Sequence, residues 1–229
     1  DWDDNLPEES RKDLRNWHQQ LERLDQLEFK RYLGVSPASS VSCHVFCDAS
    51  CEAYGTVVYL RIENESEVVV NQVFAKARVT PVKSVSIPRL ELVAACLAVK
   101  VGQRVTNSLG VNIEQTFYWT DSMDVLYWIQ QRSKIFKTFV ANRVSYIQER
   151  TTGLQWRHVS SRSNPADLLT RGATVEQLTT NETWRSGPEF LSNRSEEWPK
   201  QPAMPIKAKN EERRKEFTMM TVVSVDQPE

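Results

Sequence analysis

Four acidic residues stand where a folded chain could direct their carboxylates to one site. Asp48 ends the apolar run VFCD and Asp121 ends FYWTD, so both are predicted at strand ends. Glu91 is the only polar residue in the stretch LELVAACLAV, and Asp167 falls in the first turn of a short helical segment. Taken singly, each acid also has a bland explanation as a turn former or as a charge at a helix N-terminus.

The chemistry that these four acids could carry out follows from the repulsion between their carboxylates. Carboxylates gathered at one site either stay partly protonated or are neutralised by divalent cations. Oxygen-only ligands suit Mg²⁺ or Mn²⁺, and two such ions about 4 Å apart suit in-line displacement at phosphorus. The acids therefore predict a metal site for phosphate chemistry.

Cysteine offers a rival metal site, which strand geometry disfavours. The chain has four cysteines, Cys43, Cys47, Cys51 and Cys96, too few and too crowded for a disulfide scaffold, so reduced thiols are expected. Strand alternation places Cys43 and Cys47 on one face and His44 on the other, which does not favour zinc.

The elements that must position the acids follow from apolar periodicity. Apolar residues at three- and four-residue spacing between Leu14 and Leu27 predict a helix, and three valine-rich runs from Val41 predict consecutive antiparallel strands. A helix is predicted from Pro88 to near Gly110. The next predicted elements are a strand at 115–120, the helices SMDVLYWIQQ and FVANRVSYIQER, and a strand at 154–159. The last is a short helix in ADLLTR, for which Asn164 and Pro165 are the expected N-cap and first turn. The order β-β-β-α-β-α-α-β-α predicts a mixed α/β layer.

Composition sets the class of protein. With 229 residues, 40% apolar and 26% charged, the chain is expected to form one globular core with flanking segments. No apolar run reaches the ~18 residues of a membrane span and the N-terminus does not resemble a signal peptide, so we expect a soluble intracellular protein without membrane contact.

Charge is unevenly distributed although the formal net charge is −1. Between residues 70 and 105 the basic residues face a single acid, Glu91, and this stretch is a candidate polyanion surface. A solvated basic face is the equally open alternative. The basic residues are Lys76, Arg78, Lys83, Arg89, Lys100 and Arg104.

These motifs together resemble a known family. FCDAS, RLELVAACLAV, YWTDS and NPAD resemble the ribonuclease H domain of reverse-transcribing elements in both strand order and acid order. KARVTPVKSVSIPRLEL, DSMDVLYWI and HVSSRSNPADLLTRG are similar to the BEL/Pao class of long-terminal-repeat retrotransposon polyproteins. The resemblance is strong over roughly 40–172.

The resemblance implies a fold and an activity. It implies a ribonuclease H-like mixed five-stranded sheet with helices on its faces, and hydrolysis of the RNA strand of RNA/DNA hybrids during reverse transcription. Asp48, Glu91, Asp121 and Asp167 would then be catalytic and would bind two Mg²⁺ ions, with Mn²⁺ as a substitute. The products would carry 5′-phosphate and 3′-hydroxyl ends.

Further residues are expected to contact nucleic acid. Backbone groups around Ala49, Ser50 and Ser122 are candidates for sensing 2′-hydroxyls. Lys76, Arg78, Lys83 and Arg89 are candidates for phosphate contacts, and Arg162 is the only charged residue of the loop SSRSNP. Many relatives carry a histidine in this loop, whereas here His158 is predicted inside the preceding strand.

The resemblance also divides the chain. Residues 1–35 resemble the connection segment after the polymerase, 36–172 form the ribonuclease H-like domain, and 173–229 resemble a partly disordered spacer before integrase. The expected partners are the hybrid and the reverse transcriptase and integrase regions of the same polyprotein. The expected location is a cytoplasmic retrotransposon particle or the nucleus.

The order of the acidic residues along the chain distinguishes this sequence from other enzymes with the same fold. Integrases and transposases place a glutamate last, and proofreading exonucleases place one two residues after the first aspartate, where Ser50 stands here. Both are disfavoured. The serious alternative is a non-catalytic connection or scaffold domain that binds nucleic acid.

Overall fold

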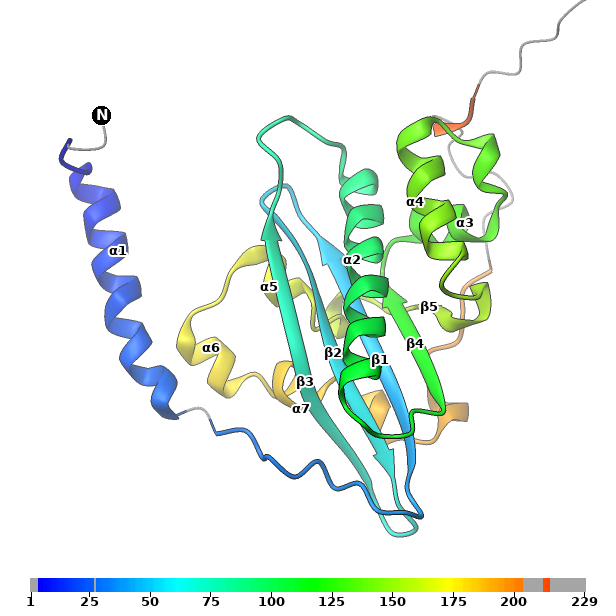
Figure 1. Ribbon diagram of the computed structural model, residues 1–229. Coiled ribbons are helices and arrows are strands. Elements are labelled where there is room, and N and C mark those ends of the chain that lie inside the picture. The colour runs from blue at the N-terminus through cyan, green and yellow to red at the C-terminus, as the bar shows by residue number, and fades with distance from the viewer. Residues whose placement is uncertain (1–3, 27, 204–211, 215–229) are drawn as a thin grey trace, which may run out of the picture.

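A mixed sheet of five strands forms the centre of the molecule (Figure 1). The structure is a computed structural model that describes residues 4–26, 28–203 and 212–214. The strands are β1 (Ser40–Ala49), β2 (Ala53–Glu63), β3 (Val68–Val79), β4 (Gln115–Thr120) and β5 (Trp156–His158). Their order is β3-β2-β1-β4-β5, with antiparallel pairing among the first three and parallel pairing of β4 with both β1 and β5. The predicted five-stranded mixed sheet is confirmed.

Three helices cover one face of this sheet. They are α2 (Ile87–Ser108), α3 (Met123–Gln130) and α4 (Thr138–Gln148), and Figure 1 shows α2 crossing the strands with α3 and α4 beside it. Ser86 is the N-cap residue of α2 and Pro88 lies in its first turn, where the absent N–H costs no helical hydrogen bond. The apolar residues of α2 pack on β1 and β2 in the larger core.

The opposite face is covered by the chain that follows β5. It carries α5 (Asp167–Arg171), α6 (Val175–Thr180), α7 (Glu182–Ser186) and, after α7, the 3₁₀ turns Glu189–Ser192 and Ser195–Glu197. An aromatic cluster lies beneath them, in which Phe46 and Trp119 from the sheet are fully buried and Trp198 is 6% exposed. The buried Arg61 guanidinium donates to the Leu191 carbonyl at 2.8 Å.

This cover bears on the predicted division of the chain. The segment from 173 was expected to be a partly disordered spacer. Its described residues up to 203 form short helices and turns, and Trp184, Phe190, Leu191 and Trp198 among them belong to the second core. This packing is possible although the segment is mostly polar, because a few large aromatic side chains suffice to cover the apolar face of the sheet. The division of the chain into three regions otherwise stays a prediction.

The N-terminal helix is present but packs little. Helix α1 (Glu8–Leu21) continues into a 3₁₀ turn, Glu22–Gln26, and Figure 1 shows α1 standing apart from the sheet. Leu14 and Trp17, on its predicted apolar stripe, are 53% and 58% exposed. Leu27 of the same stripe lies outside the described residues.

Smaller observations concern the cysteines and the helices. Cys43 and Cys47 lie in the larger core, while His44 faces the aromatic cluster and accepts a hydrogen bond from Trp119 Nε1 at 3.2 Å. The described cysteines are all free thiols, as expected. No helix among the described residues combines the length and apolarity needed to cross a bilayer.

Candidate active site

Strand pairing brings two of the predicted acids side by side. Strands β1 and β4 are parallel neighbours, and Phe46 pairs with Trp119 two residues before Asp48 and Asp121 respectively. Both carboxylates therefore leave the sheet at the same edge, where mixed and parallel sheets present ligand-binding groups. Asp48 is 5% exposed and Asp121 is half-buried.

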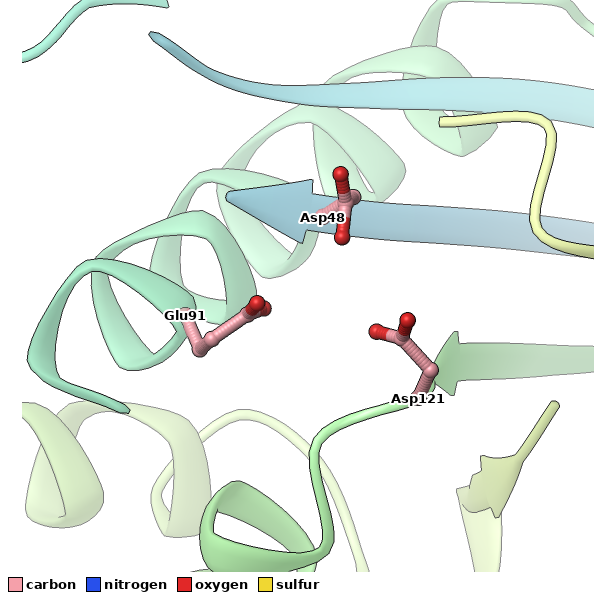
Figure 2. A group of neighbouring side chains, drawn as sticks. All are labelled: Asp48, Glu91 and Asp121. Atoms are coloured by element: carbon pink, nitrogen blue, oxygen red, sulfur yellow. The ribbon is translucent and has the colours of Figure 1, made fainter. Parts of the chain in front are cut away.

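Helix α2 supplies the third acid. Its second turn faces the strand ends, and Figure 2 shows Glu91 directed from the helix toward Asp48 and Asp121. One oxygen from each of the three carboxylates lies within 4.8 Å of the others. The predicted convergence of these three residues is therefore observed, and we call them the acidic cluster.

Asp167 lies at the edge of the same site. It is the first residue of α5 and lines, with the acidic cluster, a cleft of about 530 Å³. Its Oδ1 accepts from Arg171 Nε at 2.7 Å, so part of its charge is already compensated. The helix begins at Asp167 rather than at Pro165, because Asn164 and Pro165 form a separate turn before it.

The pKa values of the acidic cluster are raised, as expected for carboxylates that are buried close together. Burial, and then the charges of Asp48 and Asp121, raise the pKa of Glu91 to about 9, against an opposing backbone hydrogen bond from Ala49. Burial chiefly raises the pKa of Asp48 to about 6, with Thr170 opposing the rise and the charges of Asp121 and Asp167 adding to it. Without a cation, Glu91 is therefore protonated at neutral pH.

Two oxygens of the cluster lack partners, which makes it suited to a cation. Within the described residues, Glu91 Oε2 and Asp121 Oδ1 are buried side-chain atoms without a hydrogen bond. A buried acceptor without a donor costs free energy, and a hard divalent ion would be a partner for both. The donor set, the orphaned oxygens and the raised pKa values all fit Mg²⁺ or Mn²⁺.

Strand β1 and α5 are held together by contacts that the sequence analysis missed. The buried Thr170 hydroxyl donates to Asp48 Oδ2, and the Asn164 side chain donates to the Cys47 carbonyl at 3.0 Å. A Cβ on Gly55 would lie 2.8 Å from Leu169 Cβ, so glycine permits α5 to approach β2 this closely. Nothing in the pattern of DLLTR distinguishes this threonine from a surface residue.

Thr170 is thus a positioning residue for Asp48. Thr170→Val keeps the side-chain shape but removes the donor, and we expect about tenfold weaker Mn²⁺ binding by calorimetry, since outer hydrogen bonds orient metal ligands. Thr170→Ser, which keeps the hydroxyl, is the matched control and should bind Mn²⁺ as the wild type does. Equal affinity in the valine variant would show that the hydroxyl does not orient Asp48.

A second missed contact comes from the loop after β5. Ser161 Oγ donates to Asp121 Oδ2 at 2.6 Å. This is the loop in which the sequence analysis noted the missing histidine, and it contacts the acidic cluster through a serine. His158 lies in the strand, as predicted, but as the last residue of a shorter β5, and its backbone N–H donates to the Gln201 side chain.

The residues proposed to sense 2′-hydroxyls lie in different settings. Ala49 and Ser50 line the cleft, although Ser50 Oγ already donates to the Thr170 carbonyl at 2.7 Å. Ser122 is the N-cap of α3 and accepts from the Val125 N–H at 3.4 Å. Arg162 is exposed in the turn Ser161–Ser163 and does not line the cleft.

The proposed phosphate contacts are also dispersed. Lys76 and Arg78 are exposed on the edge strand β3, and Lys83 is exposed in the connection to α2. Arg89 forms a bidentate ion pair with Glu212, at 2.8 and 3.0 Å. The sequence analysis did not predict this ion pair, because its two residues are far apart in the chain and Glu212 is one of many charged residues in its segment.

Comparison with known proteins adds the family. No curated protein matches the chain. Ribonuclease H1 from the archaeon Halobacterium salinarum NRC-1 is 15% identical, over 58% of this chain and 95% of its own, with a TM-score of 0.35. LC11 ribonuclease H1, which was isolated from compost and solved with an RNA/DNA hybrid, is 16% identical. The match covers 61% of this chain and 99% of that chain, with a TM-score of 0.38.

The family model that matches is described as the Pao retrotransposon-like RNaseH-like domain, and it covers residues 1–122. The match contains Asp48, Glu91 and Asp121, and it begins at the leader that precedes the sheet. Together with the mixed five-stranded sheet, it confirms the predicted ribonuclease H-like α/β fold. The match spans more than half of the chain, and the chain therefore belongs to the family of Pao retrotransposon-like RNaseH-like domains.

Proposed function

We propose that this domain is a divalent-metal-dependent ribonuclease H that hydrolyses the RNA strand of RNA/DNA hybrids during reverse transcription of a retrotransposon. The observation that carries the proposal is the acidic cluster, in which three carboxylates converge within 4.8 Å and two buried oxygens have no partner among the described residues. A domain kept only as a scaffold has no need for this costly arrangement.

The roles of the residues follow from the geometry. Asp48, Glu91 and Asp121 would hold the ions, with Asp167 completing the set at the rim of the cleft. When bound, two Mg²⁺ ions would supply the Lewis acidity for attack by water at phosphorus and for departure of the 3′ oxygen. Glu91, whose pKa is raised without metal, would have to give up its proton to hold a cation, because only its ionised form is a strong ligand.

Other residues would bind the substrate. The backbone around Ala49 and Ser50 lies at the cleft, where the sugar of an RNA strand could be sensed. Lys76, Arg78 and Lys83 would contact phosphates. Arg89 could do so only after separating from Glu212, since its guanidinium is already paired. Ser122 and Arg162 are weaker candidates, because neither lines the cleft.

The wider setting is also part of the proposal. The domain would act beside the reverse transcriptase and integrase regions of one polyprotein, in a retrotransposon particle in the cytoplasm or in the nucleus. This setting rests on the family alone.

A labelled hybrid tests the proposal directly. The full chain with Mg²⁺ should cut the RNA strand of the hybrid and leave a DNA duplex of the same sequence intact. Binding is measured separately in Ca²⁺. Binding without cleavage, under conditions where a known ribonuclease H cuts the same hybrid, would favour the scaffold function instead.

The choice of metal gives a second expected result. Oxygen-only ligation predicts cleavage with Mg²⁺ or Mn²⁺, loss of cleavage with EDTA, and inhibition by Ca²⁺, whose looser coordination supports in-line geometry poorly. Adding Mg²⁺ back after chelation should restore the initial rate. Cleavage that persists in excess EDTA would contradict a metal-dependent mechanism.

A further inference from the structure

A basic groove lies between the edge strand β3 and the outer face of α2. It encloses about 260 Å³, has a partly apolar floor that includes Leu97, and is lined by four cationic side chains. These are Lys76, Arg78, Lys100 and Arg104. We call this feature the β3–α2 groove. A second hollow of about 440 Å³ shares Arg78, Leu97 and Lys100 with it and extends it toward Arg143 on α4.

Among the residues that the structure describes, the cations of the groove have no acidic counterparts. No acid lines either hollow, and within the described residues none of the four side chains forms an ion pair within 4.0 Å. Lys100 and Arg104 are four residues apart on one helix, a spacing at which like charges destabilise the helix. Lys76 and Arg78 likewise share one face of β3. A bound polyanion would relieve this repulsion.

A β-bulge adds an aromatic side chain to the same groove. The pairing of β2 with β3 shifts between Val58 and Tyr59, because Val73 is an extra residue opposite them. Val73 and Phe74 consequently both line the groove, although neighbouring strand residues normally point to opposite faces. Phe74 is 40% exposed, so its ring is available to a ligand.

The groove is continuous with the elements that carry the acidic cluster. Ala77, between Lys76 and Arg78, pairs with Gly55, and Gly55 pairs with Asp48. At the other end, Arg104 follows Glu91 by 13 positions on α2, or about 20 Å along the helix axis. The groove therefore extends away from the catalytic end of the sheet.

We propose that the β3–α2 groove binds a single-stranded polynucleotide that extends from the hybrid held at the acidic cluster. The proposal rests on the function proposed above and deepens it. Cations along a groove bind the backbone, and an exposed aromatic ring stacks with unpaired bases. A duplex turns its bases inward and would leave Phe74 and the apolar floor unused.

The test compares a blunt hybrid with four extended hybrids, each bound by the full chain. Each extended hybrid carries a single-stranded DNA extension of eight nucleotides at a different one of the four strand ends. Binding is measured by fluorescence anisotropy, in the Asp121→Asn background to prevent cleavage. We expect at least one extension to raise the affinity on the order of tenfold at low salt.

Two variants locate that gain. The double variant Lys100→Glu, Arg104→Glu should abolish it and reduce the log–log salt slope by about 1.4, with blunt-hybrid binding little changed. The control Lys12→Glu, Lys30→Glu makes the same charge change at exposed positions outside the groove and should keep the gain. Phe74→Ala should reduce the gain roughly fivefold.

The outcomes separate the two proposals. No gain from any extension, or an equal gain in the groove variant and the control, would overturn the groove assignment whether or not the hybrid is cleaved. A gain lost only in the groove variant supports it, even if the wild-type chain fails to cleave, a failure that counts against the nuclease function alone.

Discussion

Replacing Asp121 by asparagine is expected to abolish hybrid cleavage, lowering turnover on the order of 10³-fold or more while the protein remains folded. Asp121 faces Asp48 and Glu91, and one of its buried oxygens has no partner among the described residues, so the substitution would remove a proposed cation ligand. Asp48→Asn and Glu91→Gln should have comparable effects. Turnover is measured with the labelled hybrid and folding by circular dichroism.

The matched control is Asp25→Asn, the same chemical change at an exposed position in the turn after α1. It should cleave at the wild-type rate. Near-wild-type turnover in all three variants of the acidic cluster would contradict the assignment of the site, because each of them removes one of its carboxylates.

Without metal, the protein is expected to lose stability as pH rises from about 5 to 9. The pKa of Glu91 is about 9 in the folded protein, against 4.5 for the ordinary group, so the folded state retains a proton that the unfolded chain releases in this window. Asp48, with a pKa of about 6 against 3.8, adds to the loss in the lower part of the window. Each group contributes at most about 1.4 kcal/mol per pH unit.

Thermal unfolding in EDTA across this range measures the effect. Glu91→Gln has no proton to lose, so its curve should be flatter and its melting temperature at pH 8 higher than that of the wild type. Saturating Mg²⁺ should stabilise the wild type more than this variant, because a cation that binds the folded state shifts the equilibrium toward folding. A wild-type stability in EDTA that is independent of pH would refute the protonation of Glu91.

Much of the sheet and the acidic cluster could be predicted from local patterns. The strand at 115–120 is found at the predicted residues, and helix α2 begins within one residue of Pro88. Such elements are strongly patterned, since alternation and a proline at the helix start are signals of local geometry. The convergence of Asp48 and Asp121 then followed from strand ends meeting at one edge, and that of Glu91 from a helix start facing them.

The remaining features depend on contacts between distant residues. The hydrogen bond of Thr170 to Asp48 spans 122 positions, and the ion pair of Arg89 with Glu212 spans 123. No window of sequence contains both members of such a pair. Helix α1 shows the opposite limit: its periodicity predicted the helix, but periodicity alone does not show whether the apolar stripe of Leu14 and Trp17 finds a partner.

The late cover of the aromatic sheet face has a consequence for folding during synthesis. Strand β2 contacts the cover through Arg61, whose partner Leu191 lies 130 residues later, and through Tyr59, which donates to Trp184 125 residues later. Contacts of such high sequence separation form slowly, and an apolar sheet face left open meanwhile promotes aggregation. A ribosome-bound chain ending near residue 172 would thus carry all four acids and still expose Phe46 and Trp119. We expect it to engage chaperones until the segment bearing Trp198 emerges.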